Sequence, residues 1–138
     1  MQIRLATEMD LEQLVLLFDE YRQELGQGSD LSRCREFLRA RLLENDSMIF
    51  IATEGDYPVA FTQVFPSFSS LLLKPLWYLD DLFVLPDYRG QGIAKELTCR
   101  ARTLAQDAKV LAVKREFGEL SQQVETDGTE QGLYHALL

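Results

Sequence analysis

The chain has 138 residues, with 14 basic and 22 acidic side chains, so its formal net charge at pH 7 is −8. This length predicts one domain, residues 1–138, that can bury a core. The negative charge argues against nucleic acid as a partner, because phosphate backbones repel an acidic protein. Cys34 and Cys99 lie too far from any histidine pattern for a zinc site, and we expect no metal.

The sequence also bears on the cellular compartment. Two cysteines in a chain of this size are typical of reduced thiols in a cytoplasmic protein. The sequence shows no N-terminal signal pattern and no apolar run of about 18 residues. We therefore expect a cytoplasmic protein with no membrane partner.

The N-terminal quarter predicts a strand followed by a helix. Residues 2–6 alternate in the way of a short edge strand. Apolar residues from position 11 to about position 25 then recur with helical spacing. Thr7 and Asp10 are both placed to cap this helix at its N-terminus.

A second helix and a hairpin are expected next. Asp30 or Ser32 can serve as the N-cap of the second helix. Residues 47–55 and 57–66 are rich in β-branched and aromatic side chains and are separated by a Gly-Asp pair. This pattern predicts a β-hairpin.

The central part predicts a loop, a strand and a helix. Residues 67–74 are expected to form a connecting loop. Residues 76–86 are almost continuously apolar and predict a strand, interrupted only by Asp80 and Asp81. Helical spacing then runs from Gly92 to about residue 108.

Beyond residue 108 two interpretations are possible. Residues 110–113 form a buried strand in the first. In the second the helix continues toward Phe117, Gly118 ends it, and residues 119–126 form the next strand. Gly118 favours the second interpretation, because glycine is a good helix terminator. Residues 129–138 predict a short final helix.

Gly90 and Gly92 lie at the junction between the predicted strand and the helix that follows. The first N–H groups of a helix have no internal acceptor, and this end of the helix dipole is positive. Glycines there allow an anion to approach these groups, although a tight packing turn is the alternative. The segment does not fit the mononucleotide P-loop, because Lys95 is followed by Glu96 and not by serine or threonine. It does not fit the dinucleotide fingerprint either, because Lys95 stands where that motif has its last glycine.

A third pattern fits this segment. "RGQGIA", residues 89–94, resembles the acetyl-CoA pyrophosphate loop of the GCN5-related N-acetyltransferases (GNAT). The longer string "WYLDDLFVLPDYRGQGIAKEL", residues 77–97, is similar to the spermidine/spermine and small-amine acetyltransferase branch. The resemblance implies an α/β (α+β) fold, with a mixed, mostly antiparallel twisted sheet flanked by helices and splayed at the CoA-binding strand.

The resemblance also implies how acetyl-CoA is held, with no metal. The backbone of the strand would pair with the pantetheine arm, the glycine loop would bind the pyrophosphate, and Asp127 stands where the family usually has an asparagine that fixes the arm. The implied cofactor-binding residues are Leu82, Phe83, Val84, Arg89, Gly90, Gln91, Gly92, Ile93, Ala94, Lys95 and Asp127.

Catalytic roles follow from the same resemblance. Tyr134, in "GLYHALL", is the expected general acid for the leaving thiolate, and the N–H of Phe83 is the expected donor to the thioester carbonyl. Asp80 is the expected base, and Asp81 is expected to bind a cationic amine. Strand alternation predicts that these two aspartates point to opposite faces.

The acceptor pocket and the last helix complete the expected site. Glu20 and Tyr21 are expected to bind the acceptor substrate, because the family often builds this pocket late in its first helix. His135 is expected to have a surface or packing role, since its side chain points roughly 100° away from that of Tyr134 on a helix.

The C-terminus departs from the family pattern. The sequence ends at Leu138 without the last two strands that usually complete the sheet. There are three alternatives: the chain is truncated, another subunit of a homodimer supplies the edge of the sheet, or the fold closes differently.

The expected function is direct acetyl transfer from acetyl-CoA to a small cationic primary amine. The alternatives are a catalytically degenerate CoA-binding module and a protein N-terminal or lysine acetyltransferase.

Overall fold

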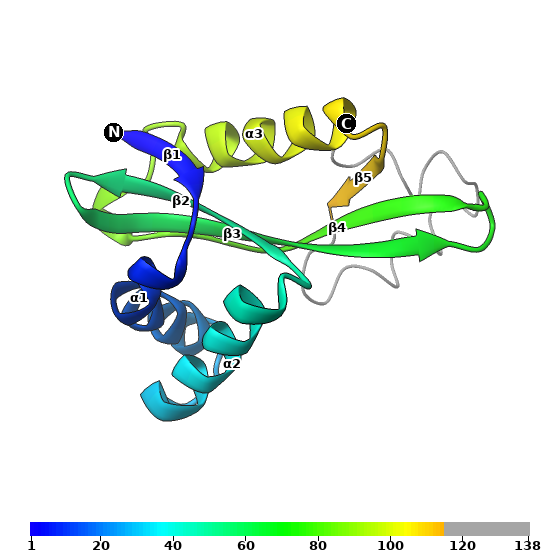
Figure 1. Cartoon of the computed structure of the whole chain (residues 1–138). Coiled ribbons are helices and arrows are strands. Elements are labelled where there is room, and N and C mark those ends of the chain that lie inside the picture. The colour runs from blue at the N-terminus through cyan, green and yellow to red at the C-terminus, as the bar shows by residue number, and fades with distance from the viewer. Residues whose placement is uncertain (115–138) are drawn as a thin grey trace.

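A computed structural model of the chain describes residues 1–114 (Figure 1). Its elements in chain order are β1 (Gln2–Leu5), η1 (Glu8–Asp10), α1 (Leu11–Glu24), α2 (Leu31–Glu44), β2 (Met48–Glu54), β3 (Tyr57–Ser69), β4 (Lys74–Val84), η2 (Pro86–Tyr88), α3 (Ile93–Asp107) and β5 (Leu111–Lys114). Within this part of the chain no helix is long and apolar enough to cross a membrane.

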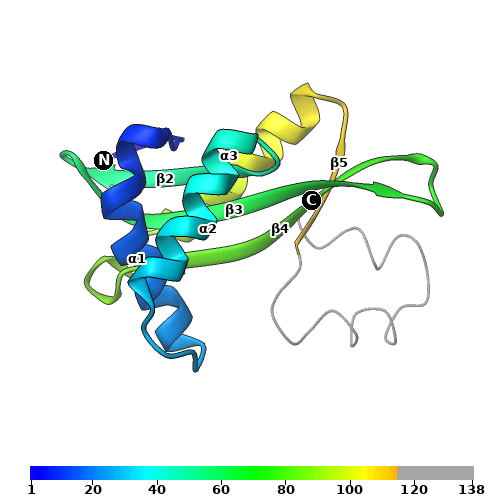
Figure 2. The ribbon, with the colours of Figure 1, turned by 60° about the horizontal axis from the view of Figure 1, so that its bottom comes forward.

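The strands form one mixed sheet in the order β1-β2-β3-β4-β5. Neighbours from β1 to β4 are antiparallel, whereas β5 runs parallel to β4. Helix α3 makes the crossover between these two parallel strands and covers one face, while α1 and α2 cover the other (Figures 1 and 2). The expected mixed, mostly antiparallel sheet flanked by helices is confirmed.

Each helical layer buries its own apolar cluster against the sheet. On the α3 side, Leu97 and Ala101 pack against strand residues that include Leu79. On the side of α1 and α2, Leu14 and Leu38 pack against Phe61 and other strand residues. A sheet whose two faces are both covered explains why β2 and the first half of β3 are almost continuously buried.

The predicted beginnings of the helices agree with the structure in detail. Thr7 and Asp10 together form a capping box around η1, which leads directly into α1. The Asp30 carboxylate accepts a 3.1 Å hydrogen bond from the Arg33 N–H and caps α2. Residues 2–5 form the predicted strand, and among the described residues β1 pairs only with β2.

The predicted loop over residues 67–74 is wrong. The β3–β4 ladder continues to the pair Ser69↔Lys74, so only residues 70–73 turn the chain. The Ser69 hydroxyl accepts a 3.1 Å hydrogen bond from the Leu72 N–H within this turn. The result is a long two-stranded arm that extends beyond the other strands (Figure 1).

The favoured interpretation beyond residue 108 is also wrong, because residues 111–114 form β5. Helix α3 ends at Asp107 with Ala108 as its C-cap, and the next residue, Lys109, adopts a left-handed conformation with φ of 58°. The Lys109 N–H donates to the Gln106 carbonyl at 3.0 Å, and the Val110 N–H donates to the Ala105 carbonyl at 2.9 Å. These two bonds form a Schellman motif, which usually contains glycine where this chain has lysine.

Candidate active site

One edge of β4 is open at its C-terminal end. Strand β5 pairs only with Leu76–Leu79, whereas β3 pairs with β4 as far as Val84. From Asp80 to Val84 the strand therefore has one neighbour, and within residues 1–114 no strand covers its other edge. The expected splaying at this strand is present.

The hydrogen-bond ladder shows which backbone groups face this open edge. The Leu85 N–H donates to the Val59 carbonyl of β3 at 2.9 Å. Alternate residues of an antiparallel strand bond to the same neighbour, so the backbone groups of Phe83 also face β3. The backbone groups of Leu82 and Val84 face the open edge. In agreement with this, Arg89 Nε donates a hydrogen bond to the Val84 carbonyl at 2.8 Å.

This orientation corrects one expectation. The N–H of Phe83 is directed toward β3 and cannot reach a ligand that lies along the open edge. The N–H of Leu82 faces that edge instead. Periodicity alone did not give this result, because the pairing register determines which residues face outward.

Gly90 and Gly92 connect the open strand edge to α3. Both have left-handed backbones, with φ of 80° and 82°, which glycine adopts without strain. A Cβ atom added to either would meet no atom within 4 Å, so packing against the described residues does not require glycine there. The first α-helical hydrogen bond runs from the Glu96 N–H to the Gly92 carbonyl, which leaves the preceding N–H groups available to an anion.

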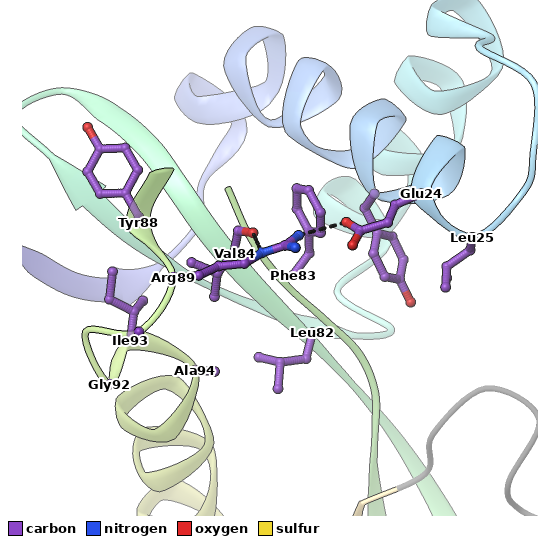
Figure 3. Close-up of a pocket in the computed structure, with 12 residues that line it drawn as sticks. Glu24, Leu25, Leu82, Phe83, Val84, Tyr88, Arg89, Gly92, Ile93 and Ala94 are labelled. Atoms are coloured by element: carbon purple, nitrogen blue, oxygen red, sulfur yellow. Dashed lines mark hydrogen bonds and ion pairs between the residues drawn. The ribbon is translucent and has the colours of Figure 1, made fainter. Parts of the chain in front are cut away.

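A cleft of about 430 Å³ joins the strand edge and the glycine loop (Figure 3). It brings together most of the predicted cofactor residues from β4, the loop and the start of α3, together with Tyr21 from α1. Its lining residues are Tyr21, Glu24, Leu25, Leu82, Phe83, Val84, Tyr88, Arg89, Gly90, Gly92, Ile93 and Ala94. Gln91, Lys95 and Glu20 are exposed and do not line it.

The Arg89 side chain crosses this cleft. Its Nη2 atom lies 2.7 Å from Oε2 of Glu24, while its Nε atom bonds the Val84 carbonyl, as Figure 3 shows. The guanidinium also lies over the Phe83 ring, 5.5 Å from its centroid. Arg89 therefore connects the loop, the open strand edge and the end of α1.

Tyr21 connects α1 to the aspartates of β4. Its hydroxyl donates a 2.9 Å hydrogen bond to Oδ1 of Asp81, and its ring packs edge-on against Phe61 at 5.3 Å. Burial raises the pKa of Tyr21, and the negative charges of Asp81 and Asp80 raise it further. The phenol is therefore protonated at neutral pH and acts as a hydrogen-bond donor.

A β-bulge changes the expected orientation of the two aspartates. The β3 residues Gln63 and Val64 pair with Asp81 and Leu79, so Asp80 is the extra residue. Leu79 and Leu82 both pack on the α3 side although they are three positions apart. The predicted opposite orientation of Asp80 and Asp81 is therefore wrong, since both are left on the side of Tyr21.

Several predicted residues lie outside the described part of the chain. These are Asp127, Tyr134 and His135, so their positions stay predictions. Within residues 1–114, no group of three or more histidine, cysteine, aspartate or glutamate side chains is arranged to hold a metal ion.

The sequence reasoning missed three residues that line the cleft, namely Glu24, Leu25 and Tyr88. Glu24 and Leu25 follow Tyr21 by three and four positions. Residues at this spacing share one face of a helix, so the position of Tyr21 contained the signal for both. Tyr88 lies directly before the glycine loop, and no pattern in the sequence indicated that it would line the cleft.

Comparisons with known proteins agree with this geometry. The family model described as "Acetyltransferase (GNAT) family" matches residues 11–133. The uncharacterized N-acetyltransferase YhfO of Bacillus subtilis (strain 168) is 39% identical over 118 residues, which are 84% of this chain and 79% of that protein.

Solved structures show the same fold. The crystal structure of a probable acetyltransferase is 34% identical and superposes with a TM-score of 0.78, covering 94% of this chain and 90% of the other. Another structure, of a predicted acetyltransferase with acetyl-CoA from Clostridium acetobutylicum, has a TM-score of 0.71 at 18% identity, with coverage of 85% and 80%. The chain therefore belongs to the GNAT family of acetyltransferases and is an N-acetyltransferase.

Proposed function

We propose that the protein transfers the acetyl group of acetyl-CoA directly to a small cationic primary amine. One observation carries this proposal: Asp80 and Asp81 lie on the same face of β4, at the start of its open edge, with Asp81 bonded to Tyr21. Carboxylates at this position can attract an ammonium group and accept its proton next to the bound thioester.

The residues around the cleft fit acetyl-CoA. The backbone groups of Leu82 and Val84 are oriented to pair with an extended amide-containing arm, as an added strand would. Gly90 and Gly92 leave open space beside unpaired helix N–H groups, which suits a pyrophosphate. When bound, acetyl-CoA supplies an activated acetyl thioester.

The proposed roles divide the reaction among these side chains. Asp81, oriented by Tyr21, holds the ammonium group, and Asp80 takes its proton. The amine nitrogen then bonds to the thioester carbonyl carbon while the Leu82 N–H stabilises the negative charge on the carbonyl oxygen. The carbon–sulfur bond breaks, and Tyr134 donates a proton to the leaving thiolate. The nitrogen releases its second proton to water, and Tyr134 regains a proton from water.

The two residues outside the described part complete the proposal. Asp127 fixes the cofactor arm and Tyr134 is the acid, both on the strength of the resemblance alone. A Tyr134→Phe variant that binds CoA but has lost turnover would support the acid role, and full activity would exclude it. A single domain, a homodimer and a cytoplasmic location also stay predictions.

An acceptor panel tests the function. Acetyl-CoA is incubated with 1,4-diaminobutane, with n-butylamine and with a short peptide that has a free N-terminus, and thiol release is measured with the mass of the acetylated product. The diamine is expected to be the best acceptor, because its second ammonium group adds a contact with the acidic groups. Preference for the peptide would indicate a protein acetyltransferase, and CoA binding without thiol release from any acceptor would indicate a binding module.

A further inference from the structure

A second pocket, of about 260 Å³, lies between α1 and α2. It is lined by Phe18, Arg22, Arg33, Cys34 and Phe37. The cofactor cleft shares none of these residues, so the acetyltransferase reaction described above does not account for the pocket. Its volume falls just below the usual range for drug-sized ligands, which fits a small molecule.

The apolar part of the pocket has a flat aromatic wall. The rings of Phe18 and Phe37 stack at 6.0 Å with an angle of 8° between their planes, and Phe37 remains 40% exposed. Cys34 is buried beside them, and burial raises the pKa of its thiol, so it adds no negative charge at neutral pH. The Arg41 guanidinium lies over the Phe37 ring, 4.9 Å from its centroid, so one face of this ring is already covered and a planar apolar group can pack on the remaining aromatic surface.

The polar part of the pocket is cationic. The guanidinium of Arg22 has only long contacts, at 3.4 Å to the Gly28 carbonyl and 3.8 Å to Sγ of Cys34. Arg33 is exposed, and no hydrogen bond of its side chain is present within residues 1–114. Among these residues neither arginine forms an ion pair of 4 Å or less.

The nearby acidic groups already accept hydrogen bonds from other residues of α1, α2 and the segment between them. The Asp19 carboxylate accepts hydrogen bonds from Ser29 Oγ at 2.7 Å, the Asp30 N–H at 2.8 Å and Gln23 Nε2 at 2.9 Å. Asp30 in turn caps the N–H of Arg33. Neither carboxylate lines the pocket, but Asp19 also accepts a 3.6 Å hydrogen bond from Sγ of Cys34, and the nearby charge of Arg22 helps to lower the pKa of Asp19. The charged groups that line the pocket itself are the two arginines.

We propose that this pocket binds a small aromatic carboxylate. Arginine matches a carboxylate with paired N–H donors, and the ring of such a ligand can pack on Phe37. A free amine would be repelled by the two guanidinium groups, and a bare inorganic anion would leave the aromatic wall uncovered. The ligand class therefore differs from that of the amine acceptor and of acetyl-CoA.

Titration with phenylacetate tests the proposal, with chemical shifts of the backbone N–H and arginine Nε–H groups as the readout. Saturable shifts are expected at α1 and α2, and they should persist in the presence of saturating CoA. Phenethylamine, which has the same ring with a positive charge, and inorganic phosphate are expected to cause no saturable shift there.

Matched variants assign the binding to the pocket. Arg33→Gln and Arg22→Gln should each raise the dissociation constant of phenylacetate by about tenfold or more, which is the effect of losing a charged hydrogen bond. Arg39→Gln, on the exposed surface of α2 outside the pocket, should leave it unchanged. Any one of four results would overturn the proposal. These are no saturation by phenylacetate, equal binding of phenethylamine or phosphate, competition by CoA, and an unchanged affinity for phenylacetate in the folded Arg33→Gln variant.

Discussion

The hydroxyl of Tyr21 donates a 2.9 Å hydrogen bond to the carboxylate of Asp81, a residue 60 positions later in the chain. This contact joins α1 to β4, and Tyr21 also lines the cofactor cleft, whereas Asp81 does not. Because burial and the two aspartates keep the pKa of Tyr21 raised, the phenol remains a donor throughout the neutral range. Tyr21 is therefore a positioning residue for Asp81 and cannot serve as a base at neutral pH.

Replacing Tyr21 by phenylalanine should weaken acceptor binding. The variant keeps the ring packing on Phe61 but loses the hydrogen bond that orients Asp81. A hydrogen bond to a charged group corresponds to a factor of about ten or more, so KM for a cationic amine should rise by about tenfold while kcat changes less. Steady-state kinetics measure this split. The control Tyr57→Phe, on an exposed residue that does not line the cleft, should match the parent, and an unchanged KM in Tyr21→Phe would contradict the role.

The two aspartates should differ in kinetic effect although they share a face. Asp80→Asn removes the proposed base, so kcat should fall by about 10² to 10⁴ with a smaller change in KM. Asp81→Asn should mainly raise KM for cationic amines and have less effect on an uncharged hydroxylamine acceptor. If Asp80→Asn mainly raises KM and Asp81→Asn mainly lowers kcat, then Asp81 is the base and Asp80 binds the amine. If both variants have wild-type kinetics, neither aspartate takes part in the mechanism.

Glu24→Gln should increase the affinity for CoA. Arg89 occupies the Val84 carbonyl at the open edge while its guanidinium is held by Glu24. A cofactor arm that pairs with this edge must displace Arg89. Both partners of the ion pair are about half-exposed, so its loss should improve the dissociation constant by no more than about fivefold. Calorimetry measures this change. Glu44→Gln, at the exposed end of α2, is the control, and weaker CoA binding in Glu24→Gln would show that the Arg89–Glu24 contact supports binding instead.

Asp19 should contribute to stability in a pH-dependent way. Hydrogen bonds, the largest from the Asp30 N–H, lower its pKa in the folded state below the ordinary value of 3.8. The stabilisation is therefore present above about pH 4 and is lost as pH falls through the lower folded-state pKa. Asp19→Asn should reduce the free energy of unfolding by about 1–3 kcal/mol at pH 7.

Urea unfolding at pH 7, 5 and 3 checks this expectation. The difference between Asp19→Asn and the parent should be similar at pH 7 and 5 and smaller at pH 3. Asp107→Asn, on an exposed carboxylate at the end of α3, should show little effect at any of these pH values. A difference that grows toward low pH would contradict the direction of the pKa shift.

The sequence predicted the elements that have strong local signals. Thr7 with Asp10, and Asp30, are caps with a clear chemical role, and the Gly90–Gly92 pair has the positive φ angles expected at a strand-to-helix junction. The end of α3 was missed because Lys109 adopts a left-handed conformation that lysine gives no reason to expect. The hydrogen bonds of the turn, together with the burial of the next strand, stabilise it there.

The details of the site depended on tertiary pairing. The bulge at Asp80 places two consecutive aspartates on one face, and no periodicity of the sequence signals a bulge at this point. The direction of the Phe83 N–H likewise follows from the register with β3, and register is a property of two strands. The salt bridge between Glu24 and Arg89 joins residues that are 65 positions apart.

The most direct test of the account is a calorimetric titration of CoA into Gly92→Val, with Gly55→Val as the matched control. Both glycines have positive φ, at 82° and 62°, and at both an added Cβ meets no atom within 4 Å, so both variants should lose stability through backbone strain. Only Gly92 lines the cofactor cleft. The account predicts that CoA affinity falls by at least about tenfold in folded Gly92→Val and stays unchanged in Gly55→Val. Equal CoA affinity in the two folded variants would contradict the placement of the pyrophosphate on the glycine loop.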